Sequence, residues 1–163
     1  MTRILIVDDE KTIRKLLERI ATRAGFEVDV ARDGLEALEM LGRQTYDIAI
    51  VDLMMPRLSG YDLVQQISTM NPRPTVIVAT AMMNGDAASL DDSMVRRVIK
   101  KPFDINAVAA ALVETARQIA DERNSPSPPI VVLDDAAVNA VESTDEKTPA
   151  APKDPTPPKQ GTS

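Results

Sequence analysis

The chain has 163 residues, 44% of them hydrophobic, which suits one domain of ordinary size with an appendage. It contains no Cys and no His, which excludes disulfides, thiolate metal sites and imidazole catalysis, so any bound metal must have oxygen ligands. The formal net charge of −6 offers no general attraction to nucleic acid.

Residues 1–123 alternate short apolar runs with segments of helical periodicity. In chain order, the sequence predicts the strand Arg3–Val7, helix Lys11–Ala24, strand Phe26–Ala31, helix Leu35–Leu41, strand Asp47–Val51, a helix from Ser59 or Gly60 to Met70, strand Thr75–Ala79, short helix Gly85–Asp92, strand Arg97–Lys100 and helix Asp104–Arg123. Gly25 and Gly42 are predicted to end the first and second helices. Asp33 and Asp104 are predicted to cap the second and last helices.

Five strands alternating with five helices predict an α/β fold in which helices cover both faces of a parallel sheet. Right-handed crossovers make this a doubly wound, open sheet. The last strand, Arg97–Lys100, is shorter and more polar than the others, so we expect it at an edge. The apolar run Ile4–Val7 is too short for a signal peptide or a membrane span, and a soluble cytoplasmic protein is expected.

The composition changes near Asn124. Eight of the 12 Pro lie at or after Pro126, and large apolar side chains become rare towards the C-terminus. Such a segment buries too little to offset the entropy lost on ordering, so residues 124–163 are predicted to be a disordered, Pro-rich tail. The island Ile130–Leu133 within it fits either a short docking segment or a weakly hydrophobic stretch of linker.

Polar residues follow four of the predicted strands, where an open doubly wound sheet binds its ligands. These residues are Asp8-Asp9-Glu10, Asp52, Thr80-Ala81 and Lys100-Lys101-Pro102. A single Asp after a strand is usually a turn residue or a helix cap, but four such strand ends together indicate chemistry. Clustered carboxylates need a cation, and oxygen-ligated Mg²⁺ is the natural one. One carboxylate can then attack a phosphoryl group while Mg²⁺, an ammonium and a hydroxyl neutralise the transferring oxygens.

Four segments resemble the receiver domain of two-component response regulators. They are Ile4–Glu10, Ile50–Gly60, Val78–Ala81 and Lys100–Phe103, in the order and spacing of that family. The resemblance covers residues 1 to about 122 and implies a receiver domain at residues 1–123. It also implies a flavodoxin-like parallel sheet with the strand order 2-1-3-4-5.

The resemblance implies a role for each acidic residue. Asp52 corresponds to the phosphoacceptor. Asp9 and Asp52 correspond to direct Mg²⁺ ligands, together with the backbone carbonyl of Met54. Asp8 would act on the cation through water.

The remaining family positions concern the phosphoryl group itself. By the resemblance, Thr80 donates a hydrogen bond to it and Lys101 forms an ion pair with it. The Lys101–Pro102 peptide bond is expected to be cis, as the family's Lys-Pro bond typically is. A sensor histidine kinase or a histidine phosphotransfer protein would supply the phosphoryl group, because this chain has no His of its own.

Two departures from the family pattern affect signalling. Val98 stands where the family often has Tyr or Phe. In the family this aromatic side chain swings inward when the Thr binds the phosphoryl group, and valine is too short to make that movement. We therefore expect the surface beside the last strand to change less on phosphorylation. Met54 and Met82 flank the expected acyl phosphate, and neither orients an attacking water, which predicts slow self-dephosphorylation.

Three other functions compete with a phosphorylation-dependent signalling protein. A binding module could use the same fold without phosphorylation, although the acceptor residues are intact. A haloacid-dehalogenase-type phosphatase favours a second Asp two residues after the nucleophile, where this chain has Met54. A flavodoxin-like FMN protein needs a phosphate-cradling Ser/Thr/Gly loop after the first strand, where this chain has three acids.

The sequence therefore favours a single-domain response regulator that is not an enzyme. The tail is too short and too polar for a winged helix or a catalytic domain, and it has three Lys and no Arg. We expect no direct DNA binding and no membrane contact. Output would pass through docking to a downstream protein target or through a phosphorelay.

Overall fold

The computed structural model describes residues 1–81, 90–91 and 93–125. Its helices and strands are β1 (Arg3–Val7), α1 (Lys11–Arg23), β2 (Glu27–Ala31), α2 (Gly34–Arg43), β3 (Ile48–Val51), α3 (Gly60–Ser68), β4 (Thr75–Thr80), β5 (Val95–Lys100) and α4 (Ile105–Asn124). The predicted helix Gly85–Asp92, apart from Leu90 and Asp91, lies outside the described residues. The predicted tail beyond Ser125 also lies outside the described residues. Residues Met1–Ser125 form one compact unit.

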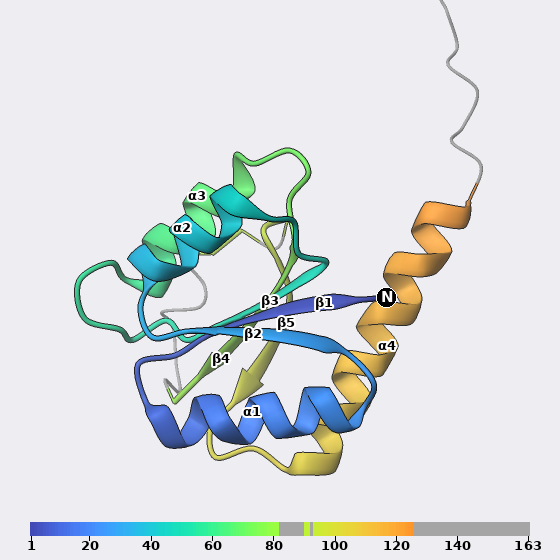
Figure 1. The fold of residues 1–163 in the computed structure, drawn as a ribbon, viewed down its shortest axis with the longest axis horizontal. Coiled ribbons are helices and arrows are strands. Elements are labelled where there is room, and N and C mark those ends of the chain that lie inside the picture. The colour runs from blue at the N-terminus through green and yellow to red at the C-terminus, as the bar shows by residue number, and fades with distance from the viewer. Residues whose placement is uncertain (82–89, 92, 126–163) are drawn as a thin grey trace, which may run out of the picture. The chain divides into compact units, whose positions relative to one another are not determined.

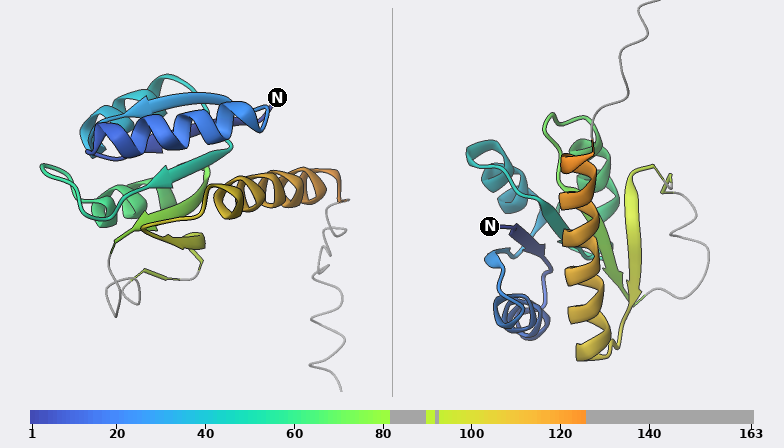
Figure 2. Two further views of the ribbon diagram at one scale, coloured as in Figure 1. Left: turned by 90° about the horizontal axis from the view of Figure 1, so that it is seen from below. Right: turned by 90° about the vertical axis from the view of Figure 1, so that its right-hand side faces the viewer.

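The strands form a five-stranded, wholly parallel sheet in the order β2-β1-β3-β4-β5. This confirms the predicted α/β class and the strand order that the family resemblance implies. Figure 1 shows α2 and α3 on one face of the sheet and α1 and α4 on the other, so the sheet is doubly wound. β5 lies at an edge, as predicted from its polar sequence (Figure 2).

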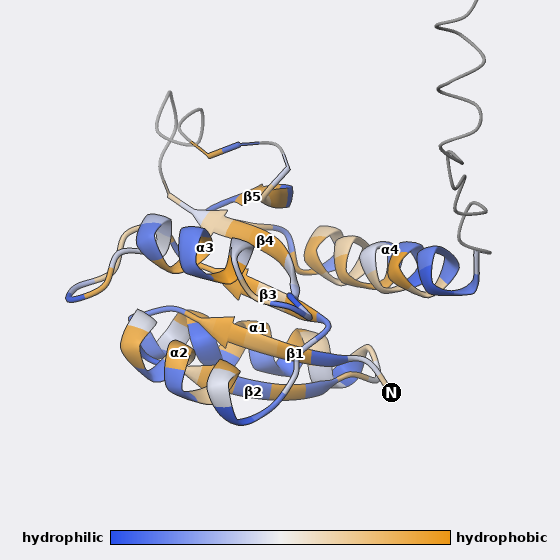
Figure 3. Ribbon diagram, turned by 90° about the horizontal axis from the view of Figure 1, so that it is seen from above, coloured by the Kyte–Doolittle hydropathy of each residue, from blue (hydrophilic) through white to orange (hydrophobic). Residues whose placement is uncertain are grey.

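Each face of the sheet has its own aliphatic core. Leu5 and Val7 of β1 pack into the core beneath α2 and α3, whereas Ile4 and Ile6 pack into the core beneath α1 and α4. All residues of β3 are buried, as expected of a central strand that helices cover on both sides. Figure 3 shows β3 and β4 in hydrophobic colours, while β5 is more mixed.

The helix ends agree with the predicted signals except at Gly42. Gly25 follows α1 with a φ of 93°, the left-handed backbone that glycine adopts without strain. Asp33 and Asp104 accept hydrogen bonds from Glu36 N and Ala107 N, both at 2.9 Å, and so cap α2 and α4. Gly42 does not end α2, because the helix continues to Arg43 and is closed by Gln44.

The other boundaries differ by a few residues. α3 ends at Ser68 rather than Met70, and β5 begins at Val95 rather than Arg97. Among the described residues, no helix combines the length and apolar character needed to span a bilayer.

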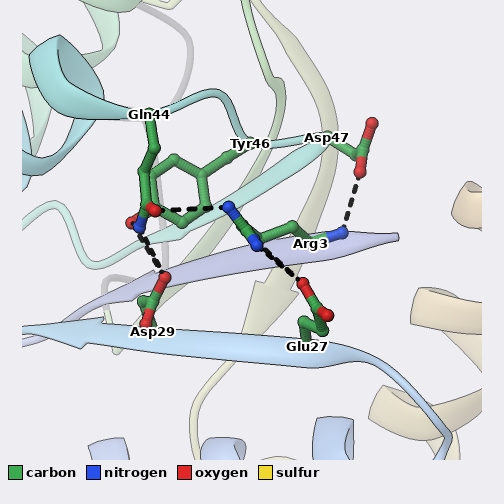
Figure 4. A network of polar contacts seen from close by, with 6 residues as sticks. All are labelled: Arg3, Glu27, Asp29, Gln44, Tyr46 and Asp47. Carbon is green, nitrogen blue, oxygen red and sulfur yellow. Dashed lines mark hydrogen bonds and ion pairs between the residues drawn. The ribbon is translucent and has the colours of Figure 1, made fainter. Parts of the chain in front are cut away.

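A polar network joins the amino ends of β1, β2 and the segment before β3 (Figure 4). Its members are Arg3, Glu27, Asp29, Gln44, Tyr46 and Asp47. The Arg3 guanidinium donates to Glu27 at 2.9 and 3.0 Å, and the Arg3 backbone N donates to Asp47 at 2.8 Å. Asp29 accepts from Gln44 Nε2 at 2.7 Å and from the Tyr46 hydroxyl at 3.0 Å. The network therefore closes the end of the sheet opposite to the strand ends that were predicted to carry chemistry.

One carboxylate of this network, Asp47, is expected to make the folded state less stable at acid pH. Burial alone would raise the pKa of Asp47, but hydrogen bonds from the Arg3 backbone N–H and from Arg123, and the Arg123 charge, outweigh burial and lower it. The folded state therefore holds a proton on Asp47 less readily than the unfolded state. The stabilisation is present above the usual carboxyl pKa and is lost as the pH falls through the lowered value.

We therefore expect Asp47→Asn to flatten the loss of stability below about pH 4. The difference should stay within about 1 kcal/mol, because the Arg123 side chain is 66% exposed and solvent screens the pair. Urea unfolding between pH 7 and pH 3 measures it. Equal slopes for the variant and the wild type at acid pH would contradict the assignment.

Candidate functional site

Four side chains predicted from separate strand ends lie at the carboxyl end of the sheet. Asp8 follows β1, Asp52 follows β3, Thr80 ends β4 and Lys101 follows β5. Asp8, Asp52 and Thr80 are at most 5% exposed, which is unusual for polar groups without a functional or structural partner. The sheet therefore brings four residues that are far apart in the sequence, from Asp8 to Lys101, to the same end of the sheet.

Lys101 bridges the two buried carboxylates. Its Nζ donates to Asp8 Oδ2 at 2.6 Å and to Asp52 Oδ2 at 3.1 Å. The lysine side chain is only 14% exposed, so all three groups have lost most of their water. The contacts with the ammonium compensate part of that loss for the two carboxylates. The Lys101–Pro102 peptide bond is cis, as the family resemblance implies.

Three carboxylates of the site are close enough to share one cation. Oxygen atoms of Asp8, Asp9 and Asp52 all lie within 4.8 Å of one another, with Asp8 and Asp52 buried and Asp9 exposed. One ammonium cannot neutralise three carboxylates, so a negative charge remains. An all-oxygen, partly open set of this kind suits a hard divalent cation that keeps some of its water.

The loop after β1 is held by its own backbone and by Arg14 of α1. Asp8 Oδ1 accepts from Glu10 N at 2.8 Å, which forms a turn at the start of α1. Arg14 Nη1 donates to the carbonyl of Asp8 at 2.6 Å and to that of Asp9 at 2.9 Å. The guanidinium thus fixes the backbone of both acids. The sequence does not single out Arg14, because an Arg one turn into an amphipathic helix normally faces solvent.

The segment after β3 is packed against the start of α3. Asp52 Oδ1 accepts from Met54 N at 3.2 Å, and Gly60 N donates to the carbonyl of Leu53 at 3.1 Å. A Cβ at Gly60 would lie 2.1 Å from the carbonyl oxygen of Asp52. Only glycine allows this close approach, so Gly60 helps to set the position of the Asp52 backbone.

Two groups of the site have raised pKa values, Asp52 mainly through burial and Lys101 through its acidic neighbours. Burial raises the pKa of Asp52, and the Met54 N–H and Lys101 offset it only in part, while the charge of Asp8 raises it further. Burial alone would lower the pKa of Lys101, but Asp8 and Asp52 outweigh burial and raise it. Lys101 is therefore a permanent cation, and Asp52 gains from any further positive charge that approaches it.

The remaining predicted positions differ in how they face the site. Met54, two residues after Asp52, is 56% exposed. Thr80 is buried, and its carbonyl accepts from Lys101 N at 2.9 Å, which brings the ends of β4 and β5 together. Val98, on β5, is 45% exposed. Met82 lies outside the described residues.

The chain belongs to the response regulator receiver domain family, because a model of that family matches residues 4–113. It is 30% identical over 138 residues to the response regulator MprA of Mycobacterium sp. (strain KMS), a match that covers 81% of this chain and 58% of that protein. It is 37% identical over 124 residues to the DNA-binding transcriptional regulator NtrC of Escherichia coli (strain K12), covering 76% of this chain and 26% of that one. The chain therefore spans less than two thirds of the length of these relatives.

Solved structures agree with this assignment. A CheY-like receiver domain protein from Methanospirillum hungatei has the same fold, with a TM-score of 0.70 over 75% of this chain and 98% of that chain at 23% identity. The response regulator TrrA from Thermotoga maritima, solved in complex with Mg²⁺ and BeF, gives a TM-score of 0.63 over 73% of this chain and 99% of that chain at 31% identity.

Proposed function

We propose that this chain is a phosphorelay receiver that accepts a phosphoryl group on Asp52 and signals through protein–protein interaction that depends on phosphorylation. The observation that carries the proposal is the buried contact of Asp52 with Lys101 beside two further carboxylates. A carboxylate nucleophile, a fixed ammonium and a group of carboxylates that can bind a cation are what phosphoryl transfer to an acid requires.

The donor set fits Mg²⁺. Asp9 and Asp52 would hold the ion directly with the Met54 carbonyl, and Asp8 would act through water. When bound, the ion supplies positive charge to the oxygens of the phosphoryl group. Among the described residues the site offers three carboxylates, the chain has no His or Cys to offer a nitrogen or sulfur ligand, and the three acids carry more negative charge than Lys101 neutralises.

The transfer step uses residues from the ends of three strands, β3, β4 and β5. An Asp52 carboxylate oxygen attacks the phosphorus atom, and the bond between phosphorus and the donor's nitrogen or oxygen breaks as the new bond forms. The donor leaves with the electron pair of the broken bond, and Asp52 becomes an acyl phosphate. Lys101 moves its ion pair to a phosphoryl oxygen, and Thr80 donates a hydrogen bond to another.

The donor would be the phosphohistidine of a sensor histidine kinase or of a histidine phosphotransfer protein. The output would be the docking of a downstream protein that distinguishes the phosphorylated receiver from the free one. Met54 beside Asp52 places a thioether where a polar side chain would orient water, which supports the prediction that the acyl phosphate hydrolyses slowly.

Incubation with acetyl phosphate and Mg²⁺ tests the proposal by intact-mass measurement. The wild-type chain should gain the mass of one phosphoryl group, and chelation of Mg²⁺ should abolish the gain. Asp52→Ala should gain none, whereas Asp62→Ala, which removes an acid from α3, should gain as much as the wild type. A wild type that gains nothing, or equal gains in Asp52→Ala, would contradict the proposal and favour a binding module that works without phosphorylation.

A further inference from the structure

We propose that the ion pair between Asp33 and Arg57 is a positioning device that fixes the loop after Asp52 and thereby sets the affinity of the site for its divalent cation. This inference rests on the proposed function. Asp33 precedes α2, and Arg57 lies in the loop between β3 and α3, so the pair connects two loops at the carboxyl end of the sheet.

Asp33 is a buried acid whose two carboxylate oxygens accept from different partners. Its Oδ1 accepts from Glu36 N at 2.9 Å and caps α2. Its Oδ2 accepts from Arg57 Nη1 at 3.2 Å, while Arg32 Nε is more distant at 3.9 Å. The Asp33 side chain is 7% exposed and that of Arg57 is 64% exposed, so a partly solvated cation compensates a carboxylate that has lost most of its water.

The backbone of Arg57 is held in an unfavourable conformation. Its φ is 72°, and it is the one non-glycine residue with positive φ in the part of the chain that the structure describes. An L-residue in this region is disfavoured sterically and persists only when its surroundings hold it there. The ion pair with Asp33 is a contact from outside the loop that can hold it there.

The next residue is pinned to the same element. Leu58 lies against Gly34, the first residue of α2, where an added Cβ would be 2.9 Å from two side-chain atoms of Leu58 and 3.0 Å from its carbonyl oxygen. Two consecutive loop residues, Arg57 and Leu58, therefore rest on the start of α2. A shift of the loop would therefore disturb both contacts.

The loop carries a group that the cation site would use. Met54, three residues before Arg57, donates its N–H to Asp52, and its carbonyl is the expected third ligand. The segment between Asp52 and Arg57 is short, so release of Arg57 frees the Met54 carbonyl while Asp52 stays anchored to β1 through its N–H and the carbonyl of Val7 at 2.9 Å. Loss of the pair should therefore weaken cation binding more than it affects the acceptor itself.

Titration of the full chain with Mg²⁺, followed by calorimetry or by amide shifts, tests the inference. Asp33→Asn keeps a capping oxygen but removes the ion pair, and Arg57→Ala removes it from the other side. We expect both to raise the dissociation constant for Mg²⁺ about tenfold, as loss of an outer contact to a metal site does. Asp104→Asn, which changes the cap of α4 in the same way, should leave it unchanged.

The signs of the two effects separate positioning from simple charge. If only charge mattered, Asp33→Asn would weaken Mg²⁺ binding and Arg57→Ala would strengthen it. Opposite shifts, or dissociation constants within twofold of the wild type, would overturn the inference. At saturating Mg²⁺, both variants should still gain a phosphoryl group from acetyl phosphate. A wild type that takes up neither Mg²⁺ nor phosphoryl would instead refute the proposed function.

Discussion

Lys101→Met is expected to lose about 3 kcal/mol of unfolding free energy when divalent cations are chelated. The variant leaves the carboxylates of Asp8 and Asp52 buried without their ammonium partner, with side chains only 1% and 6% exposed. Removing one member of a buried pair costs this much because the remaining charge keeps its desolvation penalty. Added Mg²⁺ should restore much of the loss, since the ion can take over the neutralisation.

The same variant should show a distinct pH dependence. Lys101 is one of the groups that hold down the pKa of Asp52, so its removal raises that pKa further in the folded state. A carboxyl with a raised pKa destabilises the folded state as the pH rises through and above that pKa. The deficit of Lys101→Met relative to the wild type should therefore be larger at pH 8 than at pH 5.

Urea unfolding with a chelator or with Mg²⁺, at both pH values, measures these effects. Lys100→Met is the matched control, because Lys100 is the neighbouring residue on β5 and is exposed. It should unfold like the wild type under all four conditions. A Lys101→Met variant as stable as this control in the chelator would show that the buried carboxylates do not depend on Lys101.

Gly60→Ala is expected to lose about 3 kcal/mol, the upper range for forced overpacking. The new Cβ would lie 2.1 Å from the carbonyl oxygen of Asp52 and 2.5 Å from the Cα of Leu53, and backbone atoms cannot swing aside. The start of α3 must therefore move away from the acceptor segment. Phosphoryl uptake from acetyl phosphate should fall with it, because Asp52 and Met54 lie in that segment.

Gly42→Ala provides the comparison for this second variant. Gly42 lies inside α2, and nothing is within 4 Å of a Cβ added there. Alanine is the better helix former, so Gly42→Ala should gain about 0.5–1 kcal/mol. Unfolding in urea measures both variants. If Gly60→Ala is as stable as the wild type, the close approach of α3 to Asp52 is not a constraint on the fold.

The wrong prediction at Gly42 shows that a glycine alone does not predict a helix end when packing favours a longer helix. A glycine costs a helix interior only about 1 kcal/mol relative to alanine, and that is too little to end a helix that packs well. Leu38 and Leu41 of α2 pack against the core, so the helix continues past Gly42 to Arg43. At Gly25, by contrast, the chain turns into β2 through a positive φ, and the glycine signal is correct.

The sequence by itself determined the helices and strands of the described residues to within a few positions, the sheet class and the residues at the strand ends. Apolar periodicity is local, and in a parallel sheet every strand points its carboxyl end the same way, so Asp8, Asp52, Thr80 and Lys101 were expected at one edge of the sheet. Only the tertiary structure decided how they are held. Three contacts show this: Arg14 donates to two loop carbonyls, Arg57 pairs with Asp33, and Gly60 lies against Asp52. These contacts depend on distances between elements, which no periodicity in the chain encodes.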